Sequence, residues 1–578
     1  MTPISAEAER RRRILTRAAP LVVVAVVAFF IGLTLGGGSP ELNAAERFVS
    51  AWETDDLEAM HRELTPEAAA QYPIEAFSEL YAKAATTATV TAIEAGEATG
   101  PSSSGEGEAV EVPVTARTAA FNAVSAPLEL PVAEGGVAWQ PHLVLPGLEP
   151  GEKLDRRTRA PQRAPIIAND GTPLAKGPAA ARSSPLGSAA VDVAGSMGVP
   201  ERGEREEVSA RGFPPGTLVG TSGLEQAFDA RLAGMPGGQL LATGGSGGDR
   251  VIAESEPAPG EPVRTTIEPG LQETTVVALG DQFGGVAVLD ATNGSVRALA
   301  GIAFSSPQPP GSVFKIVTTT AALEAGAVSL DDEFEVVTEA VVEGRAISNA
   351  GNSPCGGTFT ESFAESCNSV FAPLGAKVGG EKLLATAEDF GFNSPPALFA
   401  PDPTAVIDPP PSTIPEPIGS DLEVAVTAIG QGQVLASPLQ MATIAQTIAA
   451  GGKRSPTPLV TEPALAPEAG TTDVTDAKTA STVRDLMVAN VATGTGVAAD
   501  IPDATVAGKT GTAELGPDPD APAPAPGEDP ALEENAWFTA FAPAEKPKLA
   551  LAVMIIDASG SGGEVAAPIA AEILSSAL

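Results

Sequence analysis

The first strong pattern along the chain is an uncharged, mostly apolar run over residues 18–38. It follows a polar tail, residues 1–17, which carries Arg10–Arg13 and Arg17. A bilayer core of about 30 Å takes about 20 apolar residues in a helix, so the run predicts a transmembrane anchor. The arginines before it predict a cytoplasmic N-terminus and an extracytoplasmic remainder of the chain. A cleaved signal peptide is the competing interpretation, but no Ala-x-Ala site follows the run, and we favour an uncleaved anchor.

In the next segment, the hydrophobic positions first repeat with the period of a helix and then alternate as in strands. Residues 41–82 have the helical period, with one apolar stripe made by Leu42, Ala45, Phe48, Val49 and Trp52. Residues 86–145 alternate as strands do, most clearly over Thr86–Ile93, Ala109–Thr115 and Leu128–Pro131, with Ser102–Gly107 as a hairpin loop. Helices followed by a curved sheet predict a small α+β cone over residues 41–147. The cone could hold a ligand in a pocket or could be a spacer above the membrane, and the spacer is the simpler interpretation.

Turns and loops organise the rest of the chain. Arg163–Ala175 predicts a strand, an Asp-Gly turn and a second strand. Gly285–Asp290 and Ser295–Ala300 flank an Asn-Gly turn in the same way. The acidic, Pro-rich segment Gly516–Glu534 predicts a solvated loop between two strands, and Phe399–Pro417 predicts another Pro-rich loop.

The composition of the chain mainly excludes certain partners and types of catalytic or metal site. The 578 residues are enough for about three or four domains. The formal net charge of −39 argues against nucleic acid as a partner, because phosphate binding needs clustered positive charge. The only histidines are His61 and His142, so a Ser-His-Asp triad in the second half is impossible. The only cysteines, Cys355 and Cys367, do not make a zinc site without a nearby histidine.

The strongest candidate chemistry begins at Ser312. The Pro309–Gly311 stretch breaks whatever precedes it, and no breaker follows until Gly326, so Ser312 is predicted to open a helix with Lys315 one turn further on. A serine hydroxyl is a weak nucleophile until a base stands beside it, and this lysine can supply that base. Backbone N–H groups at a helix start also suit an oxyanion. Ser-x-x-Lys alone is a weak signal, and a capped helix with an exposed lysine is the alternative.

Two further patterns follow in order along the chain. Ser366 and Asn368 can both line a cavity if a turn between helices holds them there; the hydroxyl can pass a proton, and the amide can donate to a substrate carbonyl and to Lys315. The segment Lys509–Thr512 is predicted to be an edge strand, with a lysine for a carboxylate, two threonine hydroxyls, and Gly511 to let a substrate backbone lie close. Alone, each pattern also fits a helix cap or an ordinary exposed strand.

Together the three patterns are specific. Ser-x-x-Lys, Ser-x-Asn and Lys-Thr-Gly in this order occur in class A β-lactamases and penicillin-binding proteins. The long stretch between Ser366 and Lys509 is typical of penicillin-binding proteins. The segments Gly430–Ala442 and Ala536–Pro543 match the same family. The chain therefore resembles the class B penicillin-binding proteins over about residues 160–578.

The resemblance continues before the candidate site. Arg163–Ala175 and Gly220–Asp229 are similar to the linker or dimerisation domain of class B penicillin-binding proteins, although Ala164, Ala168, Asn169 and Phe228 depart from its patterns. The cone resembles the NTF2-like domain of the methicillin-resistance-type members. The resemblance implies these parts: cytoplasmic tail, 1–17; transmembrane anchor, 18–38; NTF2-like domain, 41–147; mostly β dimerisation or linker domain, 155–265; and α/β transpeptidase domain, 266–578, like serine β-lactamases, with an antiparallel sheet flanked by helices.

The resemblance also implies a reaction, the cross-linking of peptidoglycan by a D,D-transpeptidase. Ser312 would attack the D-Ala-D-Ala carbonyl of a stem peptide, Lys315 would be the base, and Ser366 would relay a proton to the leaving amine. Lys315 must then be neutral, so its pKa must fall through burial or through nearby positive charge such as that of Lys509.

The third pattern would bind the substrate. Lys509 and Thr510 would hold the terminal carboxylate, and the backbone N–H groups of Ser312 and Thr512 would form the oxyanion hole. Asn368 and Gly511 complete the implied catalytic and substrate-binding set. No cofactor or metal is implied.

The implied partners are peptidoglycan stem peptides, β-lactams that mimic the donor peptide, the membrane, and a SEDS-type glycan polymerase, because no glycosyltransferase domain is expected before residue 160. Three alternatives share parts of the pattern. A β-lactamase seldom carries an anchor and two leading domains, a β-lactam sensor needs more transmembrane helices, and a non-catalytic scaffold would have lost part of the three patterns.

Two expectations remain open. Cys355 and Cys367 could form a disulfide, which persists outside the cytoplasm, or Cys367 could be a small buried filler without a partner. Rapid hydrolysis of an acyl-enzyme needs a base for water, and Glu381 and Glu388 are the nearest glutamates after Asn368. They are predicted to lie on the wet side of a helix over 379–392, and no glutamate occurs over 393–406.

Overall fold

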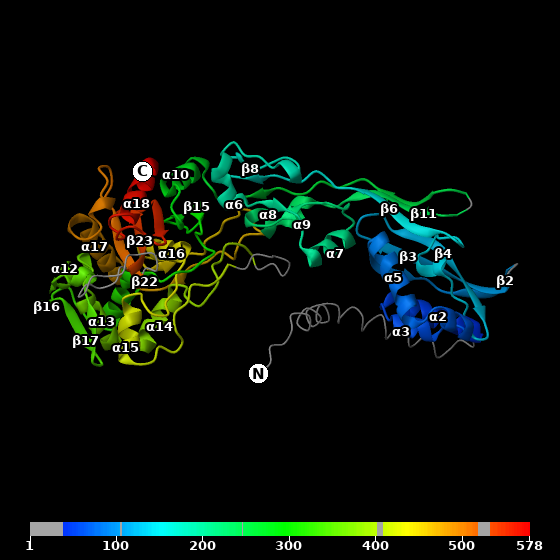
Figure 1. Cartoon of the computed structure of the whole chain (residues 1–578), viewed down its shortest axis with the longest axis horizontal. Coiled ribbons are helices and arrows are strands. Elements are labelled where there is room, and N and C mark those ends of the chain that lie inside the picture. The colour runs from blue at the N-terminus through cyan, green and yellow to red at the C-terminus, as the bar shows by residue number, and fades with distance from the viewer. Residues whose placement is uncertain (1–38, 105–106, 246, 401–408, 518–531) are drawn as a thin grey trace. The chain divides into compact units, whose positions relative to one another are not determined.

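The computed structural model describes residues 39–578 except 105–106, 246, 401–408 and 518–531 (Figure 1). The described chain forms two compact units. The first contains the residues up to 161 together with 201–215 and 235–258, and the second contains 162–200, 216–234 and 259–578. The predicted anchor over 18–38 lies outside the described residues. Within them, no helix is long and apolar enough to span a bilayer.

The helices of the first unit begin where the sequence supplies caps. They are α2 (Pro40–Glu53), α3 (Leu57–Arg62), α4 (Pro66–Gln71) and α5 (Ile74–Ala88). Side-chain oxygens of Ser39, Asp56 and Thr65 accept backbone N–H groups in the first turns of α2, α3 and α4. The predicted stripe on α2 is buried except Leu42, which is half-buried.

An antiparallel sheet follows these helices. Its strands are β1 (Val90–Ala95), β2 (Thr99–Ser104), β3 (Gly107–Thr118), β4 (Val124–Ala133) and β5 (Gly136–Val137), in the order β1-β3-β4-β5 with β2 also paired to β3. The prediction of a strand from Thr86 was wrong by one turn, because α5 continues to Ala88 and Thr89 ends it with a left-handed φ of 55°. The predicted hairpin loop at 102–107 is narrower, because its two ends belong to β2 and β3.

The core of this first unit is aromatic. Trp52, Phe77, Tyr81 and Trp139 are buried together against alternate residues of β3 and β4. Trp139 Nε1 donates to Tyr81 Oη at 3.0 Å, and the Phe77 and Trp139 rings lie 4.9 Å apart. These side chains pack where the sheet meets the helices, and the choice between a spacer and a ligand-binding domain stays a prediction. The NTF2-like assignment stays a prediction.

The predicted linker domain, 155–265, is divided between the two units. In the first unit, β6 (Lys153–Arg159), β11 (Gly237–Thr243) and β12 (Arg250–Ser255) form a sheet in the order β12-β11-β6, beside α7 (Arg202–Ala210). In the second, β7 (Ile166–Ile167) pairs with β8 (Pro173–Ala175) as the Asp-Gly pattern predicts, and β13 (Val263–Arg264) joins β7 in parallel. The domain boundary itself stays a prediction.

A buried ion cluster joins the two sequence stretches that resembled a linker domain. Arg163 Nε donates to Glu225 at 2.7 Å, and Arg163 also pairs with Asp229 at 2.9 Å. Arg182 pairs with the other carboxylate oxygen of Glu225 at 2.6 Å. The short elements in this part of the second unit are η2 (Ala179–Ala181), η3 (Gly187–Ala190), α6 (Val191–Ala194), β9 (Met197–Gly198), β10 (Val219–Gly220), α8 (Gly223–Ala227) and α9 (Asp229–Ala233).

The centre of the second unit is a five-stranded antiparallel sheet in the order β15-β14-β24-β23-β22. Three of its strands, β15, β22 and β23, are labelled in Figure 1. The strands are β14 (Gly284–Asp290), β15 (Val296–Gly301), β22 (Ala507–Pro517), β23 (Leu532–Ala542) and β24 (Leu549–Ile555). Successive residues of β24 enter opposite cores, and both faces are buried. This explains why the strand is an uninterrupted apolar run rather than an alternating one.

Helices cover both faces of this sheet. On one face lie α10 (Pro269–Leu279) and α18 (Ala566–Ala577); on the other lie α11 (Lys315–Glu324), α16 (Pro438–Ala449) and α17 (Ala477–Thr493). The remaining helices of this unit are α12 (Phe359–Ala364), α13 (Asn368–Val378), α14 (Gly380–Asp389) and α15 (Asp421–Ala428). Small strand pairs complete it: β16 (Glu333–Val337) with β19 (Cys355–Thr358), β17 (Glu339–Val342) with β18 (Arg345–Ser348), and β20 (Lys453–Arg454) with β21 (Thr472–Asp473). The predicted antiparallel sheet flanked by helices is confirmed.

Candidate active site

Ser312 lies on a 3₁₀ turn, η4 (Gly311–Phe314), directly before α11. The prediction that Ser312 opens the helix was therefore correct in place but not in helix type. Gly311 has a φ of 55° and donates its N–H to Gly430 O at 2.9 Å. A Cβ on Gly311 would lie 2.5 Å from Thr512 O. The turn is thus held tightly between the Gly430 loop and β22.

Lys315 connects this turn to the second pattern. Its side chain is fully buried at the start of α11. Lys315 Nζ donates to Ser366 O at 2.7 Å, to Asn368 Oδ1 at 2.7 Å and to Ser366 Oγ at 3.2 Å. The structure therefore brings Lys315, Ser366 and Asn368 together as predicted. The predicted direction of one bond was wrong, because Lys315 donates to the amide oxygen of Asn368 instead of accepting from its amide nitrogen.

The partners of Lys315 are compatible with a neutral amine if the 3.2 Å hydrogen bond with Ser366 Oγ runs the other way, from the hydroxyl to the amine. A carbonyl oxygen and an amide oxygen only accept, so together they take two N–H bonds of Lys315. A neutral amine has two N–H bonds, and its lone pair is then left for a hydroxyl. Burial, with a smaller contribution from the charge of Lys509, lowers the pKa of Lys315 well below its ordinary value.

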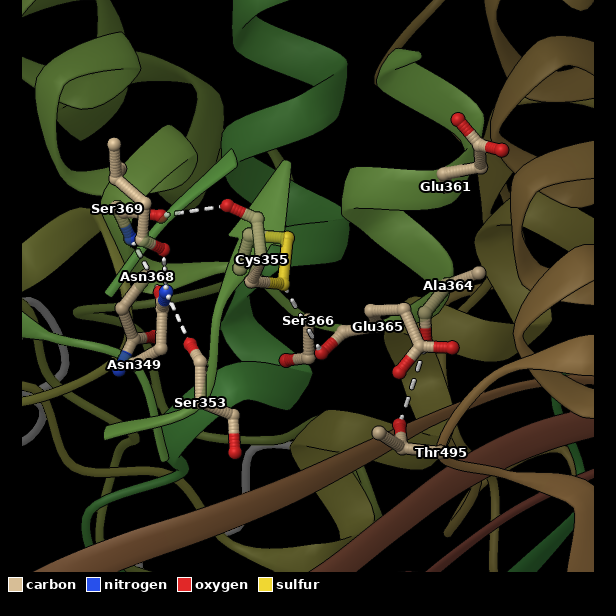
Figure 2. Close-up of a disulfide and its surroundings, with 12 residues drawn as sticks. Asn349, Ser353, Cys355, Glu361, Ala364, Glu365, Ser366, Asn368, Ser369 and Thr495 are labelled. Atoms are coloured by element: carbon tan, nitrogen blue, oxygen red, sulfur yellow. Dashed lines mark hydrogen bonds between the residues drawn. A yellow bond between two sulfur atoms is a disulfide. The ribbon is translucent and has the colours of Figure 1, made fainter. Parts of the chain in front are cut away.

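Ser366 is held in an unusual backbone conformation between α12 and α13. Its φ is 63°, in the left-handed region that costs a non-glycine residue about 1–3 kcal/mol unless its surroundings impose it. The next residue, Cys367, forms a disulfide with Cys355 on β19 (Figure 2). The open question about the two cysteines is thereby answered in favour of a disulfide, and the bond anchors the Ser366 turn to its neighbouring strand.

A buried amide, Asn349, supports the same turn from the other side. Asn349 Oδ1 accepts the N–H of Ser369 at 2.8 Å, and Asn349 Nδ2 donates to Ser353 O at 3.0 Å (Figure 2). Asn349 Nδ2 also donates to Val337 O at 2.8 Å. This amide was not predicted from the sequence, because nothing in a lone asparagine between β18 and β19 identifies its distant partners.

Lys509 lies on β22, the edge strand that the sequence predicted. Its side chain is fully buried, with Nζ 3.0 Å from Thr510 O and 5.7 Å from the centre of the Phe363 ring. Burial lowers the pKa of Lys509 to about 7, against a smaller opposing effect of Glu365. Two lysines with lowered pKa values in one buried site are typical of functional sites.

The structure gives a reason for the glycine at position 511 that was not predicted from the sequence. A Cβ at this position would lie 2.7 Å from Pro310 O and 3.0 Å from Val313 N. The absent side chain therefore makes room for the turn that carries Ser312. Space for a substrate backbone was the predicted reason, and that role stays a prediction.

Two further residues at the site were also missed, Asn490 near the end of α17 and Thr495 just after it. Thr495 Oγ1 is within hydrogen-bond distance of Thr510 Oγ1, and Asn490 Nδ2 donates to Thr495 Oγ1 at 2.9 Å. The only local signal is a Gly-Thr-Gly sequence over 494–496, which a turn after a helix would explain equally well.

The chemistry that this set of groups can perform is acyl transfer. It combines the hydroxyl of Ser312, the buried amine of Lys315, the hydroxyl of Ser366, and an edge strand that carries Lys509. Among the described residues, no group of three or more His, Cys, Asp or Glu side chains is arranged to hold a metal ion.

Comparisons with known protein families match most of the second unit. The penicillin-binding protein transpeptidase domain matches residues 284–575, and the penicillin-binding protein dimerisation domain matches residues 168–265. Both matches agree with the resemblance inferred from the three patterns.

Individual proteins give the same result. The chain is 36% identical over 296 residues to the peptidoglycan D,D-transpeptidase PbpA of Mycolicibacterium smegmatis, covering 48% of this chain and 56% of PbpA. It is 29% identical over 447 residues to the penicillin-binding protein PbpB of the same organism, covering 65% of each. The matched region thus spans about half to two thirds of these relatives.

Solved structures extend the comparison to the fold. The crystal structure of PBPA from Mycobacterium tuberculosis is similar with a TM-score of 0.56 and 26% identity, over 72% of this chain and 99% of that one. The same protein as a penicillin G acyl-enzyme complex is similar with a TM-score of 0.56 and 27% identity, over 72% of this chain and 100% of that one. With a family match over half of its length, the chain belongs to the penicillin-binding protein transpeptidase family.

Proposed function

We propose that this protein is a peptidoglycan D,D-transpeptidase that works through an acyl-enzyme on Ser312. The observation that carries the proposal is the contact of buried Lys315 with both Ser366 and Asn368, one turn after Ser312. The relatives support the same reaction, since one is named a peptidoglycan D,D-transpeptidase and another forms an acyl-enzyme with penicillin G.

The first half-reaction forms an ester. Ser312 Oγ attacks the carbonyl carbon of the penultimate D-alanine, and its proton passes to the lone pair of Lys315. Collapse of the tetrahedral intermediate breaks the C–N bond, and the proton passes through Ser366 to the leaving amine of the terminal D-alanine. In the second half-reaction, a side-chain amine of another stem peptide attacks the ester, and Ser312 regains its proton.

The edge strand β22 binds the donor peptide in this proposal. Lys509 and Thr510 hold the terminal carboxylate, and Thr512 with Ser312 supplies backbone N–H groups to the oxyanion. A lysine whose pKa is about 7 is partly charged before binding, and an arriving carboxylate stabilises the charged form. β-Lactams enter the same site and acylate Ser312.

We further propose that this reaction takes place outside the cytoplasm. Residues 18–38 anchor the protein in the membrane, residues 41–147 form an NTF2-like spacer, and a SEDS-type polymerase supplies the glycan strands. The charge-free run and the arginines before it support the anchor. Protease added to intact spheroplasts should digest residues 40–578, and full protection would refute this topology.

Adduct mapping tests the reaction itself. The purified protein is incubated with benzylpenicillin, and the modified residue is located by mass spectrometry. The adduct is expected on Ser312 and is expected to be lost in Ser312→Ala. Ser329→Ala, at an exposed serine after α11, is the matched control and should label normally. An adduct elsewhere, or unchanged labelling of Ser312→Ala, would overturn the proposal.

A further inference from the structure

The inference begins with the amide of Asn490, which is fully buried on α17. Asn490 Nδ2 donates to Ala364 O at 2.7 Å and to Thr495 Oγ1 at 2.9 Å. A backbone carbonyl can only accept a hydrogen bond, so the atom facing Ala364 O must be the amide nitrogen. Both hydrogens of that nitrogen are then used, and the oxygen of Thr495 must accept one of them.

The hydroxyl proton of Thr495 therefore has to point elsewhere. One acceptor within reach is Ala364 O, but it lies 3.4 Å away and already accepts Asn490 Nδ2 and, at 3.1 Å, the N–H of Thr495 (Figure 2). A carbonyl oxygen has two lone pairs, and both are occupied. The other acceptor is Thr510 Oγ1, which lies closer to the hydroxyl. The hydrogen bonds thus run in one direction, from Asn490 to Thr495 to Thr510.

A hydroxyl that accepts from Thr495 keeps its own proton free. We propose that Thr495 and Asn490 are positioning residues that aim the Thr510 O–H at the terminal carboxylate of the donor peptide or of a β-lactam. The proposal rests on the proposed function, since it takes Thr510 to bind that carboxylate. Hydrogen bonds in a chain polarise one another, so the Thr510 proton also becomes a stronger donor.

The backbone around Thr495 fixes this direction in advance. A Cβ on Gly494 would lie 2.1 Å from Ala364 O, and a Cβ on Gly563 would lie 2.3 Å from Thr495 O. The loop is therefore packed between the end of α12 and the Gly563 turn, with little room to rotate. A donor that is already aimed needs no reorganisation when the ligand arrives.

The experiment measures the second-order rate constant for acylation of Ser312 by two ligands. Benzylpenicillin carries the carboxylate, and its methyl ester does not. Thr495→Val removes the hydroxyl but keeps the shape, and Thr495→Ser keeps the hydroxyl. Thr493→Val, at an exposed threonine two residues earlier, is the matched control. For Thr495→Val we expect a loss of about tenfold or more with benzylpenicillin, the usual effect of one hydrogen bond to a charged group, and little change with the ester. Thr495→Ser and Thr493→Val should match the wild type.

Each other outcome contradicts the inference. An equal loss with both ligands would mean that Thr495 only supports the loop. An unchanged or faster reaction of Thr495→Val with benzylpenicillin would mean that Thr510 donates to Thr495. In a Thr510→Val background, Thr495→Val should have no further effect, and a full additional loss would also refute the relay. Every variant is also labelled with saturating benzylpenicillin. If Ser312 is still acylated, the proposed function holds even where the Thr495 relay is refuted.

Discussion

Asn368 Oδ1 lies 2.7 Å from Lys315 Nζ, and its orientation is fixed because Asn368 Nδ2 donates to Ser348 O at 2.9 Å. Asn368→Asp would place a carboxylate at that contact and raise the pKa of Lys315. Each unit of increase lowers the neutral fraction about tenfold at neutral pH. We therefore expect slow acylation of this variant at pH 7. Partial recovery at higher pH is expected with the methyl ester of benzylpenicillin, whose reaction does not depend on a charged Lys509. Stopped-flow acylation rates measured against pH check this, with Asn352→Asp, at an exposed asparagine, as the control. A profile identical to the wild type would show that the lone pair of Lys315 is not needed.

The two lysines predict a bell-shaped pH profile. Lys315 must be neutral, so the rate falls on the acid side as pH drops through its lowered pKa. Lys509 must be charged to attract a carboxylate, so the rate falls on the alkaline side as pH rises through about 7. The rate constant at low ligand concentration reports the free enzyme and is the quantity to measure. With the methyl ester of benzylpenicillin, the alkaline fall should disappear, because that ligand has no carboxylate. An alkaline fall of equal size for both ligands would exclude Lys509 as the carboxylate-binding charge.

Gly511→Ala should damage the site by pushing the Ser312 turn away from β22. The added Cβ would lie 2.7 Å from Pro310 O, and overpacking of this kind costs about 1–3 kcal/mol. We expect a lower melting temperature and acylation slower by about tenfold or more, since misplacement of a nucleophile by about 1 Å can cost 100-fold. Gly270→Ala on α10 is the control, because its Cβ would meet nothing within 4 Å. A normal acylation rate in Gly511→Ala would mean that the Ser312 turn and β22 can move apart without slowing acylation.

The Cys355–Cys367 disulfide should stabilise the fold and the Ser366 turn together. The two cysteines are 12 residues apart, and closing a loop of that length in the unfolded chain is worth about 3 kcal/mol in the chain-entropy model. The double variant Cys355→Ala, Cys367→Ala should unfold at lower urea and acylate more slowly, because Ser366 is freed from its left-handed conformation. As a companion measurement, the denatured, unreduced wild-type protein is alkylated. Neither Cys355 nor Cys367 should be modified. Two alkylated thiols would contradict the disulfide.

The sequence was sufficient to predict those helices and strands that depend mainly on their own residues. The apolar stripe of α2, the β14–β15 hairpin and the edge strand that carries Lys509 were predicted from local patterns. The order of the three motifs was enough to identify the residues that gather around Lys315, because that order is itself specific.

What sequence reasoning missed depends on contacts between distant segments. Asn349 supports Ser369, Thr495 contacts Thr510, and Gly511 makes room for Pro310. None of these pairs has a local signal, since a lone Asn, a Thr in a turn and a Gly in a strand each have ordinary explanations. The helical turn over 86–88 was missed for a related reason, because β-branched threonines favour strands but here continue a helix whose register is set by packing.

The lifetime of the acyl-enzyme distinguishes a transpeptidase from a β-lactamase. Rapid hydrolysis needs a base that activates water, which class A β-lactamases supply from a glutamate after the second motif. Here Glu381 and Glu388 lie on the exposed side of α14, while Leu383 and Ala387 of the same helix are buried, as the sequence predicted. Neither glutamate therefore points into the core beside the site, and an amine acceptor should resolve the ester far better than water. We expect a penicilloyl adduct on Ser312 that lasts minutes or longer. Intact mass is followed after excess antibiotic is removed, with and without an added acceptor amine that should shorten the lifetime. Return to the unmodified mass within seconds in the absence of any amine, with many antibiotic molecules consumed per protein, would identify a β-lactamase instead.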